Sequence, residues 1–236
     1  MTAPERAAGE AWDREYLAGR YAGAPPVAFT HDILAAAAAR GLTGGLYVGC
    51  GNGRNYLPVV GAGLDLIGLD VSPVAIAQLA ERAPERRDRL VVGDLGSLPS
   101  GSRYDLVIGI QVFQHGDRAT AHAHVRSASQ RVRAGGLIAV RVNAVGTDPA
   151  FAHLIAERHQ DSGFTVRYLE GPKRGLDVHF FSKSELARLL ADEFEPVMPL
   201  RTDATRRDPP VAGRWLQWEG IWQRRAATRR LPALPS

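Results

Sequence analysis

Short runs of apolar residues alternate along much of this chain with longer segments that mix apolar and polar residues. Short apolar runs bounded by glycine or acidic residues predict buried strands, and the longer segments predict helices. Strands are predicted at residues 45–48, 66–70, 90–94, 104–110 and 137–143, with helices at about 74–83 and 118–133. This alternation predicts a doubly wound α/β fold with a mainly parallel sheet.

The N-terminal region and the region after the fifth predicted strand follow other patterns. Residues 1–43 are predicted to be helical, at 5–18 and again at 29–40, with a break at Pro25-Pro26. Residues 144–181 contain several glycines and prolines and are too irregular for another plain strand–helix unit.

The C-terminal part predicts a helix and a hairpin. Ser182 and Glu185 have the spacing of a capping box, which predicts a helix up to about Ala191. Residues 194–200 and the aromatic segment 214–223 predict two strands joined by a loop. Such a hairpin completes a sheet of seven strands and places one antiparallel strand in it.

Size and composition fit one α/β domain. The chain has 236 residues, of which 45% are hydrophobic. No long apolar run and no basic region followed by an apolar core are present, so we expect neither a membrane span nor a signal peptide. The single cysteine, Cys50, fits a reducing compartment, and we expect a cytoplasmic protein.

The net charge of +4 and the pI near 9.6 raise the question of nucleic-acid binding. Arginine supplies all of the basic residues except Lys173 and Lys183, a composition that indicates codon bias more than a phosphate-binding face. Arginine pairs such as Arg206-Arg207 are scattered, and acids lie between several of them. We therefore predict an ordinary solvated surface and no nucleic-acid partner.

Three alternating glycines, Gly49, Gly51 and Gly53, follow the first predicted strand. A loop without Cβ atoms lets a ligand lie directly on the backbone amides, near the positive end of a following helix. Asp70 ends the second predicted strand and Asp94 ends the third. Ligand-type residues at three successive strand ends predict a nucleoside-binding edge.

Together these residues resemble a class I S-adenosylmethionine-dependent methyltransferase of the small-molecule type. The resemblance covers about residues 45–223, and its motifs are Val48-Gly-Cys-Gly-Asn-Gly53, Leu69-Asp-Val-Ser72, Val92-Gly-Asp94, Tyr104–Gln111 and the terminal hairpin. It implies a Rossmann-like fold with S-adenosylmethionine as the cofactor. The glycine loop would pass under the methionine part, Asp70 would accept hydrogen bonds from both ribose hydroxyls, and Asp94 would meet the adenine amine. The cofactor-binding residues that the resemblance implies are Gly49, Cys50, Gly51, Asn55, Asp70, Val71, Asp94, Leu95, Gln111, Phe113 and Tyr21.

The resemblance also implies a division of labour within one domain. Residues 1–43 would form a helical lid, 45–143 the cofactor-binding core, 144–181 a substrate-side insert, and 182–225 the closing helix and hairpin. The alternative is a dinucleotide-binding dehydrogenase, whose loop reads G-x-G-x-x-G. Here the third glycine comes one residue earlier, and neither the later acid nor the aromatic antiparallel strand belongs to that pattern.

One position departs from the family. Two residues before the first glycine, where these enzymes usually carry an acid, the chain has Tyr47. A tyrosine can form hydrogen bonds but cannot neutralise an ammonium group. Either Asp13 or Glu15 on the N-terminal helix takes that role, or the cofactor binds differently.

Methyl transfer is an in-line displacement, for which the protein needs a base only if the acceptor loses a proton. His115 is the candidate base because it follows the fourth predicted strand, beside the expected methyl position; alternatively it packs near the cofactor. His179 could reach the site from the insert. His122 and His124 lie on a helix predicted to face away and are expected at the surface. The seven histidines have no metal-ligand spacing, so no metal is predicted.

Several aromatic and small residues have two interpretations. Trp12, Tyr16, Arg20 and Tyr21 lie at helical spacings and either fix the first helix to the core or form a lid over the site, which we favour. Cys50 is expected to be a small residue in a crowded turn rather than a nucleophile.

Strand-end and C-terminal aromatic residues are also candidates. Gln111 and Phe113 either line the cofactor or pack at the end of their strand. Trp215, Trp218 and Trp222 are expected to pack on the sheet rather than to form a substrate cage.

The sequence favours a small methyl acceptor. Nucleic-acid amino-methyltransferases carry an Asn/Asp-Pro-Pro-aromatic turn after the fourth strand, but this chain has Ile110-Gln-Val-Phe-Gln114 there. Asp208-Pro-Pro210 does not supply that turn, because it lies in the hairpin loop and is followed by Val211. Segments 1–43 and 144–181 are of a size to cover a small molecule. We predict transfer to O, N or S of a metabolite or natural-product intermediate. The alternatives are an RNA methyltransferase and a cofactor-binding protein without transfer activity; nothing indicates the oligomeric state.

Overall fold

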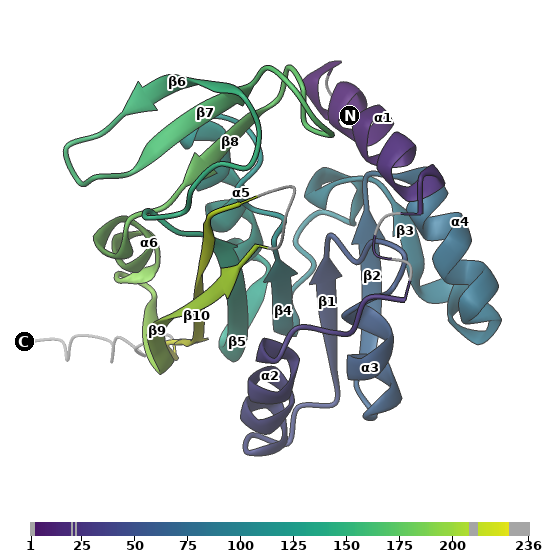
Figure 1. Ribbon diagram of the computed structural model, residues 1–236. Helices are drawn as coiled ribbons and strands as arrows, with labels where there is room; N and C mark the ends of the chain where they lie inside the picture. Colours follow the sequence, from purple (N-terminus) through teal and green to yellow (C-terminus); the bar gives the residue numbers. More distant parts are fainter. Residues whose placement is uncertain (1–2, 20, 22, 208–211, 227–236) are drawn as a thin grey trace, which may run out of the picture.

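In the computed structural model, residues 3–19, 21, 23–207 and 212–226 are described. The main sheet consists of β1 (Gly44–Val48), β2 (Asp65–Asp70), β3 (Leu90–Val92), β4 (Tyr104–Ile110), β5 (Val132–Asn143), β9 (Phe194–Arg206) and β10 (Arg214–Arg224). Their order is β3-β2-β1-β4-β5-β10-β9 (Figure 1). Strands β1 to β5 pair in parallel, and β10 runs antiparallel to both β5 and β9. The prediction of a seven-stranded, mostly parallel α/β sheet is confirmed.

The order of the strands reverses between β1 and β4. In open α/β sheets, the carboxyl ends of the strands at such a reversal frame the ligand-binding crevice. Helix α1 (Ala3–Leu17) lies above these strand ends in Figure 1, where β1, β2 and β4 point upwards. The topology therefore places the predicted glycine loop and the covering N-terminal helix at one edge of the sheet.

Helices cover both faces of the main sheet. Buried residues of α2 (Phe29–Ala38), α3 (Tyr56–Gly61) and α4 (Pro73–Arg82) form one core cluster with Tyr47 of β1. Those of α5 (Arg118–Gln130) and α6 (Lys183–Leu190) form a second cluster with Leu46 and Val48 of the same strand. Successive side chains of a strand point to opposite faces, so one apolar run serves both layers. None of the helices in the described part of the chain is long and apolar enough to cross a membrane.

Serine hydroxyls cap the starts of α4 and α6, and the second of these caps is the one that the sequence predicts. The Ser72 hydroxyl accepts a hydrogen bond from the Ala75 amide, and Pro73 takes the first helical position of α4. At α6 the Ser182 hydroxyl accepts from the Glu185 amide while the Glu185 carboxylate accepts from the Ser182 amide. Each such cap contributes about 1 kcal/mol to helix stability. Two short 3-10 helices, η1 (Pro84–Arg89) and η2 (Leu95–Ser97), precede and follow β3.

The boundary between α5 and β5 differs from the prediction. The helix ends at Gln130 rather than at residue 133, and β5 begins at Val132, five residues before the predicted start. Val132 is fully buried and pairs with Tyr104, and a register shift follows before Leu106. Burial of this valine and its pairing extend the strand across Gly135 and Gly136, which the sequence pattern alone assigns to a helix end.

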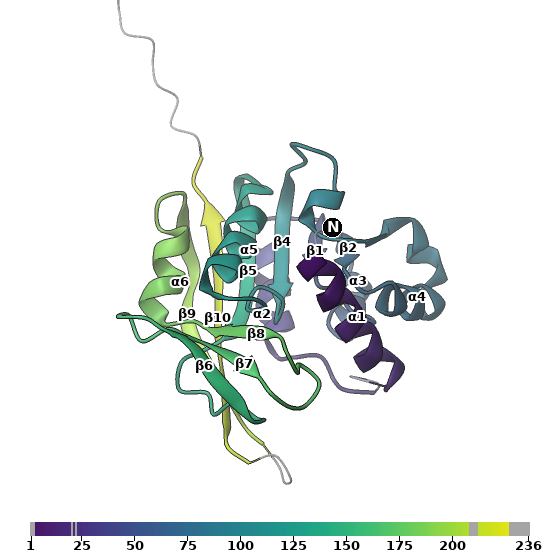
Figure 2. The same ribbon diagram turned by 90° about the horizontal axis from the view of Figure 1, so that it is seen from above.

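Residues 144–181 form a second, smaller sheet. Its antiparallel strands are β6 (His153–Arg158), β7 (Phe164–Tyr168) and β8 (Asp177–Phe180), in the order β6-β7-β8. The region is not a strand–helix unit, as expected, but its three strands were not predicted, because they are short and the outer strand β6 is largely exposed. Viewed from above in Figure 2, this sheet lies beside α1, over the carboxyl ends of the main strands.

Candidate functional site

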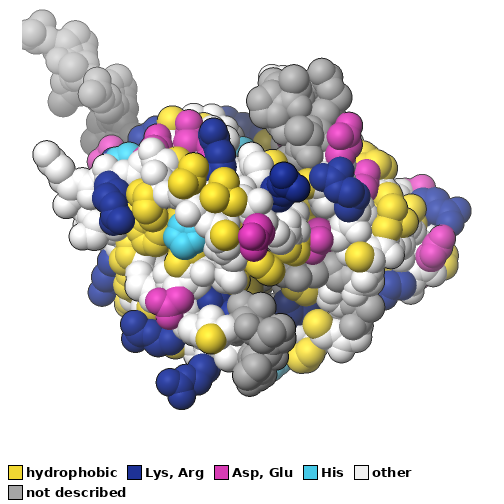
Figure 3. Space-filling view, turned by 45° about the horizontal axis from the view of Figure 1, so that its top comes forward, with side chains coloured by type: hydrophobic (Ala, Val, Ile, Leu, Met, Phe, Trp, Pro, Cys, Tyr) yellow, Lys and Arg dark blue, Asp and Glu magenta, His cyan; other side chains and the backbone are white. Residues whose placement is uncertain are grey.

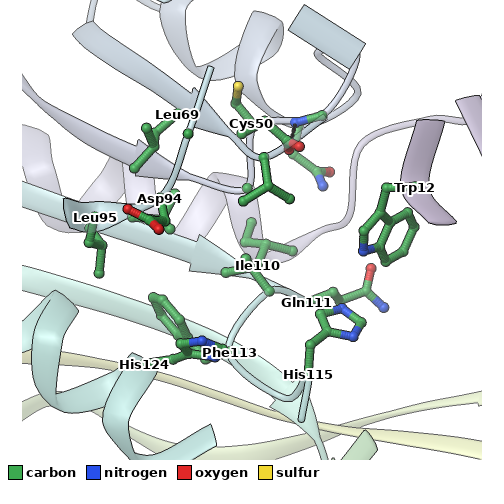
Figure 4. A pocket seen from close by; sticks show the side chains of 18 of the residues that line it. Trp12, Cys50, Leu69, Asp94, Leu95, Ile110, Gln111, Phe113, His115 and His124 are labelled. Carbon is green, nitrogen blue, oxygen red and sulfur yellow. Dashed lines mark hydrogen bonds between the residues drawn. The ribbon is translucent and has the colours of Figure 1, made fainter. Parts of the chain in front are cut away.

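A cavity of about 370 Å³ opens at the carboxyl ends of β1, β2 and β4 (Figure 4). This volume lies within the range of small-ligand pockets, roughly 300–1,000 Å³. Every residue that the sequence assigned to the cofactor or to catalysis lines it: Tyr21, Gly49, Cys50, Gly51, Asn55, Asp70, Val71, Asp94, Leu95, Gln111, Phe113 and His115. Further lining residues that the sequence analysis did not single out for the cofactor include Asn52, Arg54, Ile110, His124 and Ser127.

The glycine loop forms the floor of this cavity. Gly49 and Gly51 have φ angles of 69° and 54°, in the left-handed region that favours glycine. A Cβ atom on Gly51 would lie 2.5 Å from the Tyr16 hydroxyl of α1, so glycine lets the helix close over the loop. Gly53 does not line the cavity; its Cβ would collide with Leu57 and Leu79, so the third glycine serves packing beneath the loop rather than the ligand.

Asp70 joins the end of β2 to this loop. One carboxylate oxygen accepts the Gly51 amide at 2.8 Å and the other accepts the Ser72 amide at 2.9 Å. Burial raises the pKa of Asp70 to about 6, although the hydrogen bonds from these amides oppose the shift, and the nearby Asp13 charge adds to it. The carboxylate is therefore fixed in place by the backbone, ionised at neutral pH, and partly titrated near pH 6.

Asp94 is held by a different local motif. It is the N-cap of η2, and its Oδ1 accepts the amides of Gly96 and Ser97 at 2.7 and 3.1 Å. None of the hydrogen bonds among the described residues engages its Oδ2. The cap thus fixes the orientation of a half-buried carboxylate beside the cavity and leaves one oxygen for a ligand (Figure 4).

Tyr47, which replaces the usual acid, does not reach the cavity. Its ring is 1% exposed and packs edge-on against Tyr56 with 5.8 Å between the ring centroids. Asp13 binds the Ser72 hydroxyl at 2.5 Å and the Val74 amide, so it fixes α1 to the start of α4. Glu15 lines a neighbouring, smaller cavity instead. Neither substitute acid therefore stands at the glycine loop, where the carboxylates of the described residues are those of Asp70 and Asp94.

The loop after β4 carries strain at the same edge. Gln111 has a φ of 59°, which is uncommon for a residue with a side chain and recurs at functional sites. Its amide donates to the Arg141 carbonyl at 2.7 Å, and its own carbonyl accepts from the Gln114 side chain. Tertiary hydrogen bonds therefore hold this turn in place and present the Gln111 side chain beside Trp12 and His115 (Figure 4).

His115 lies against Trp12, with ring centroids 5.3 Å apart and the planes nearly perpendicular. The next residue, Gly116, donates its amide to the Asp177 carbonyl, which ties the loop to β8. Desolvation by the surrounding atoms, together with the charge of Lys173 and the proximity of His124, lowers the pKa of His115 well below its usual value. The imidazole is therefore neutral at neutral pH and able to accept a proton.

Comparison with known proteins relates one part of the chain to a known family. The model of the methyltransferase domain family matches residues 46–138, the part that holds the glycine loop and both aspartates. These residues are similar in sequence to a methyltransferase domain. No curated protein matches the chain.

Solved structures similar to this chain have low sequence identity and share its fold. The 1,6-didemethyltoxoflavin N1-methyltransferase of Burkholderia thailandensis, with its substrate and S-adenosylhomocysteine bound, is 21% identical. The TM-score is 0.61, and the match covers 95% of this chain and 92% of that one. The sugar N-methyltransferase KedS8 from Streptoalloteichus gives 20% identity, a TM-score of 0.58 and coverages of 89% and 92%. The magnesium protoporphyrin IX methyltransferase of Synechocystis, with bound S-adenosylmethionine, is 18% identical with a TM-score of 0.54. That match covers 83% of this chain and 77% of the other.

Three histidines of the chain lie elsewhere than predicted. His124 on α5 lines the cavity and does not face away. His122, on the same helix, approaches the Glu185 carboxylate at 2.5 Å. His179 is fully buried beside the same carboxylate at 3.1 Å and reaches neither cavity. The many alanines of α5 give it no strong apolar stripe, so the sequence could not show which side faces the protein.

Glu185 is the centre of a buried ionic cluster. Besides the two imidazoles, the Arg118 guanidinium donates to Glu185 Oε1 at 2.6 Å, and the carboxylate is 1% exposed. Burial alone would raise the pKa of Glu185, but the hydrogen bonds from His122, His179 and Arg118 outweigh it and hold that pKa far below its usual range. His122, His179 and Glu185 together have metal-ligand chemistry, which the spacing of the histidines along the chain did not reveal. Since Arg118 occupies one carboxylate oxygen, the cluster as it stands is an ion-paired network that joins α5, α6 and β8.

The N-terminal segment contributes two kinds of aromatic contact. Trp12 and Tyr16 line the cavity from α1, and Tyr21, with a φ of 61°, lies under the Arg54 guanidinium. Arg20 lies outside the described residues.

The C-terminal tryptophans divide between two roles. Trp222 is buried in the core, and Trp218 packs against it while donating to the Phe181 carbonyl, as expected. Trp215 lies on the same strand and also lines the smaller cavity beside the main one.

Proposed function

We propose that the chain transfers a methyl group from S-adenosylmethionine to O, N or S of a small-molecule acceptor. The observation that carries the proposal is a single cavity that joins the glycine loop, Asp70 and Asp94 to His115 and Trp12 beneath α1. Residues 45–143 would hold the cofactor, residues 1–43 would act as a lid, 144–181 would cover the substrate, and 182–225 would close the sheet.

The residues present fit this cofactor. Gly51 leaves no Cβ between the loop amides and a ligand, and Asp70 is buried and ionised at neutral pH. A carboxylate accepts two hydroxyl hydrogen bonds at once, as a ribose requires, and Asp94 Oδ2 is an acceptor for an exocyclic amine. Leu95 and Phe113 supply apolar walls for the adenine ring. The polar groups for the amino-acid end would come from Asn52 and other amide-bearing side chains of the cavity rather than from an acid.

His115 would act where the acceptor loses its proton. When bound, S-adenosylmethionine supplies a methyl carbon on a cationic sulfur, which takes up the bonding electron pair as the acceptor atom attacks in line. Trp12 and Gln111 would align the acceptor on the side opposite the leaving sulfur. His115, neutral at neutral pH, would take the proton that the acceptor releases.

The covering elements favour a small acceptor over RNA. The carboxyl edge is covered by α1 and the β6–β8 sheet (Figure 2). On the face drawn in Figure 3, lysine and arginine side chains are scattered and acidic side chains lie between them. An RNA-binding surface needs a continuous basic stripe to follow the phosphate backbone.

Calorimetry and transfer assays test this function. The intact chain is expected to bind S-adenosylmethionine and S-adenosylhomocysteine with micromolar affinity and NAD much more weakly. It is then expected to transfer labelled methyl groups to members of a panel of small phenols, amines and thiols, and not to RNA. Transfer to RNA alone would overturn the small-molecule proposal, and cofactor binding without any turnover would identify a binding protein.

Replacement of His115 tests its role as a base. His115→Ala is expected to lower kcat by about 100-fold, with the affinity for S-adenosylmethionine changed by less than about twofold. Because the pKa of His115 lies well below its usual value, the wild-type rate should not vary between about pH 6.5 and 8. The control is His31→Ala, at an exposed position on α2. An unchanged kcat would assign His115 to packing against Trp12.

A further inference from the structure

A second cavity of about 120 Å³ lies beside the first and shares Trp12 with it. An apolar cavity of roughly 150 Å³ holds a benzene ring, so a space of this size fits one aromatic ring. Its walls come from α1, from the end of β5 and the segment that follows it, from the smaller sheet and its β7–β8 connection, and from the terminal hairpin at β10 and at Arg207, just after β9. The lining residues are Ala11, Trp12, Glu15, Asn143, Thr147, Ala150, Phe151, Tyr168, Pro172, Lys173, Leu176, Phe180, Arg207 and Trp215.

Aromatic rings supply most of the apolar wall of this second cavity. Phe180 and Tyr168 are 1% and 7% exposed and come from neighbouring elements of the smaller sheet. Phe151 meets Tyr168 edge-on, with centroids 6.4 Å apart. The Trp215 indole donates to Asn143 Oδ1 at 3.0 Å, which fixes the orientation of its ring. Rigid, flat walls of this kind suit a planar aromatic ligand.

Two cations line the same cavity. The Arg207 guanidinium lies 6.0 Å from the centre of the Trp215 ring and donates to the backbone carbonyl of Asp148 at 2.5 Å. Among the described residues, no carboxylate forms an ion pair with the Arg207 guanidinium. The nearby Asp148 carboxylate accepts a hydrogen bond from the Arg214 amide. The Lys173 ammonium lies 5.8 Å from the centre of the Trp12 ring. With Glu15 as the single acid, the lining carries a net positive charge.

The two cavities meet at Trp12, which lines both of them. His115 contacts one edge of this indole from the first cavity, and Lys173 is close enough for its charge to lower the pKa of His115. A ring held between Trp12 and Trp215 would therefore have its far end near Arg207 and its near end at Trp12, on the side of Lys173 and His115. This arrangement places a reacting group beside the base and a charged group away from the cationic methyl donor.

We propose that the second cavity binds the methyl acceptor and that this acceptor is a planar aromatic molecule with an anionic group, a carboxylate or a phosphate. The proposal rests on the methyltransferase function above and names its substrate class. The anion lies against Arg207, and the ring lies between Trp12 and Trp215. A hydroxyl or ring N–H at the opposite end forms the new bond to the methyl carbon as the carbon–sulfur bond breaks, and its proton passes to His115.

Binding to the intact chain saturated with S-adenosylhomocysteine tests this substrate class without turnover. The probes are hydroxybenzoates, indole carboxylates and quinoline carboxylates, each paired with its primary amide, followed by ligand-observed NMR and calorimetry. Carboxylates are expected to bind at least about tenfold more tightly than their amides, because a charge-assisted hydrogen bond replaces a neutral one. Hydroxyphenyl phosphates show whether phosphate is preferred to carboxylate.

Arg207→Gln should remove the preference for carboxylates over amides. Trp215→Leu should weaken the binding of carboxylates and amides alike. Arg206→Gln, at the exposed neighbouring position that ends β9, is the matched control and should leave all affinities unchanged. Amides that bind as tightly as carboxylates, equal effects of the two arginine variants, or no aromatic probe bound would each overturn the proposal while the methyltransferase function stands. Failure of S-adenosylhomocysteine itself to bind would instead contradict the proposed function.

Discussion

Asp70→Asn is expected to weaken S-adenosylmethionine binding by about 100-fold, equivalent to about 2.7 kcal/mol. The carboxylate would accept both ribose hydroxyls, and it already accepts the Gly51 and Ser72 amides. An asparagine amide nitrogen cannot accept either kind of hydrogen bond, so the variant loses a ligand contact and loosens the glycine loop. Calorimetry measures the loss. Asp65→Asn is the matched control, since Asp65 begins the same strand and pairs with Arg86 and Arg89 away from the cavity.

The pH dependence of binding provides a second readout of the same carboxylate. The pKa of Asp70 is about 6 in the ligand-free protein, and the ionised form is the better acceptor for hydroxyls. The affinity should therefore be constant above about pH 7 and fall about tenfold by pH 5, where most molecules carry the protonated acid. The free energy of unfolding has the opposite pH dependence. Because the folded state raises the pKa of Asp70, ionising this carboxylate destabilises the fold, and its contribution to stability falls as the pH rises from about 4 to 6. A pH profile of affinity that is the same in Asp70→Asn as in the wild type would contradict the assignment.

Glu185→Ala is expected to lower the free energy of unfolding by about 3–5 kcal/mol. The substitution leaves the Arg118 guanidinium and two imidazoles without their shared carboxylate and also removes the reciprocal cap at Ser182. Thermal and urea unfolding measure the loss. Asp105→Asn is the control, because Asp105 pairs with Arg133 at the surface and such pairs contribute about 0–1 kcal/mol.

The effect of Glu185 on stability should also depend on pH. Its pKa is held far below the value of a free glutamate, so its contribution is complete above about pH 4.5 and is lost as the pH falls toward the folded-state pKa. The difference in the free energy of unfolding between the wild type and Glu185→Ala should accordingly become smaller below about pH 4. Glu185→Gln keeps the size and part of the cap, and it separates loss of charge from loss of packing. A difference that stays constant with pH would show that the charge of Glu185 contributes nothing.

Local chemistry explains what the sequence predicted correctly. The caps at Ser72 and Ser182, the positive-φ glycines and the short apolar runs are decided by residues near in sequence, so the pattern locates the strands, most helices and the loop. Parallel strands bring their carboxyl ends to one edge, and this rule places the residues assigned to the cofactor in one cavity before any side chain is positioned.

The sequence by itself determined the α/β sheet, the glycine loop and the aspartates that follow two successive strands. Only the tertiary structure decided which side of α5 faces inward, that Tyr47 is buried, and that His179 belongs to the Glu185 cluster. It also brought Trp12, Lys173, Arg207 and Trp215 together around a second cavity. These four residues come from separate parts of the chain, and no local propensity or spacing links them. Their proximity depends on packing between α1, the smaller sheet and the hairpin, which the sequence pattern of each element does not encode.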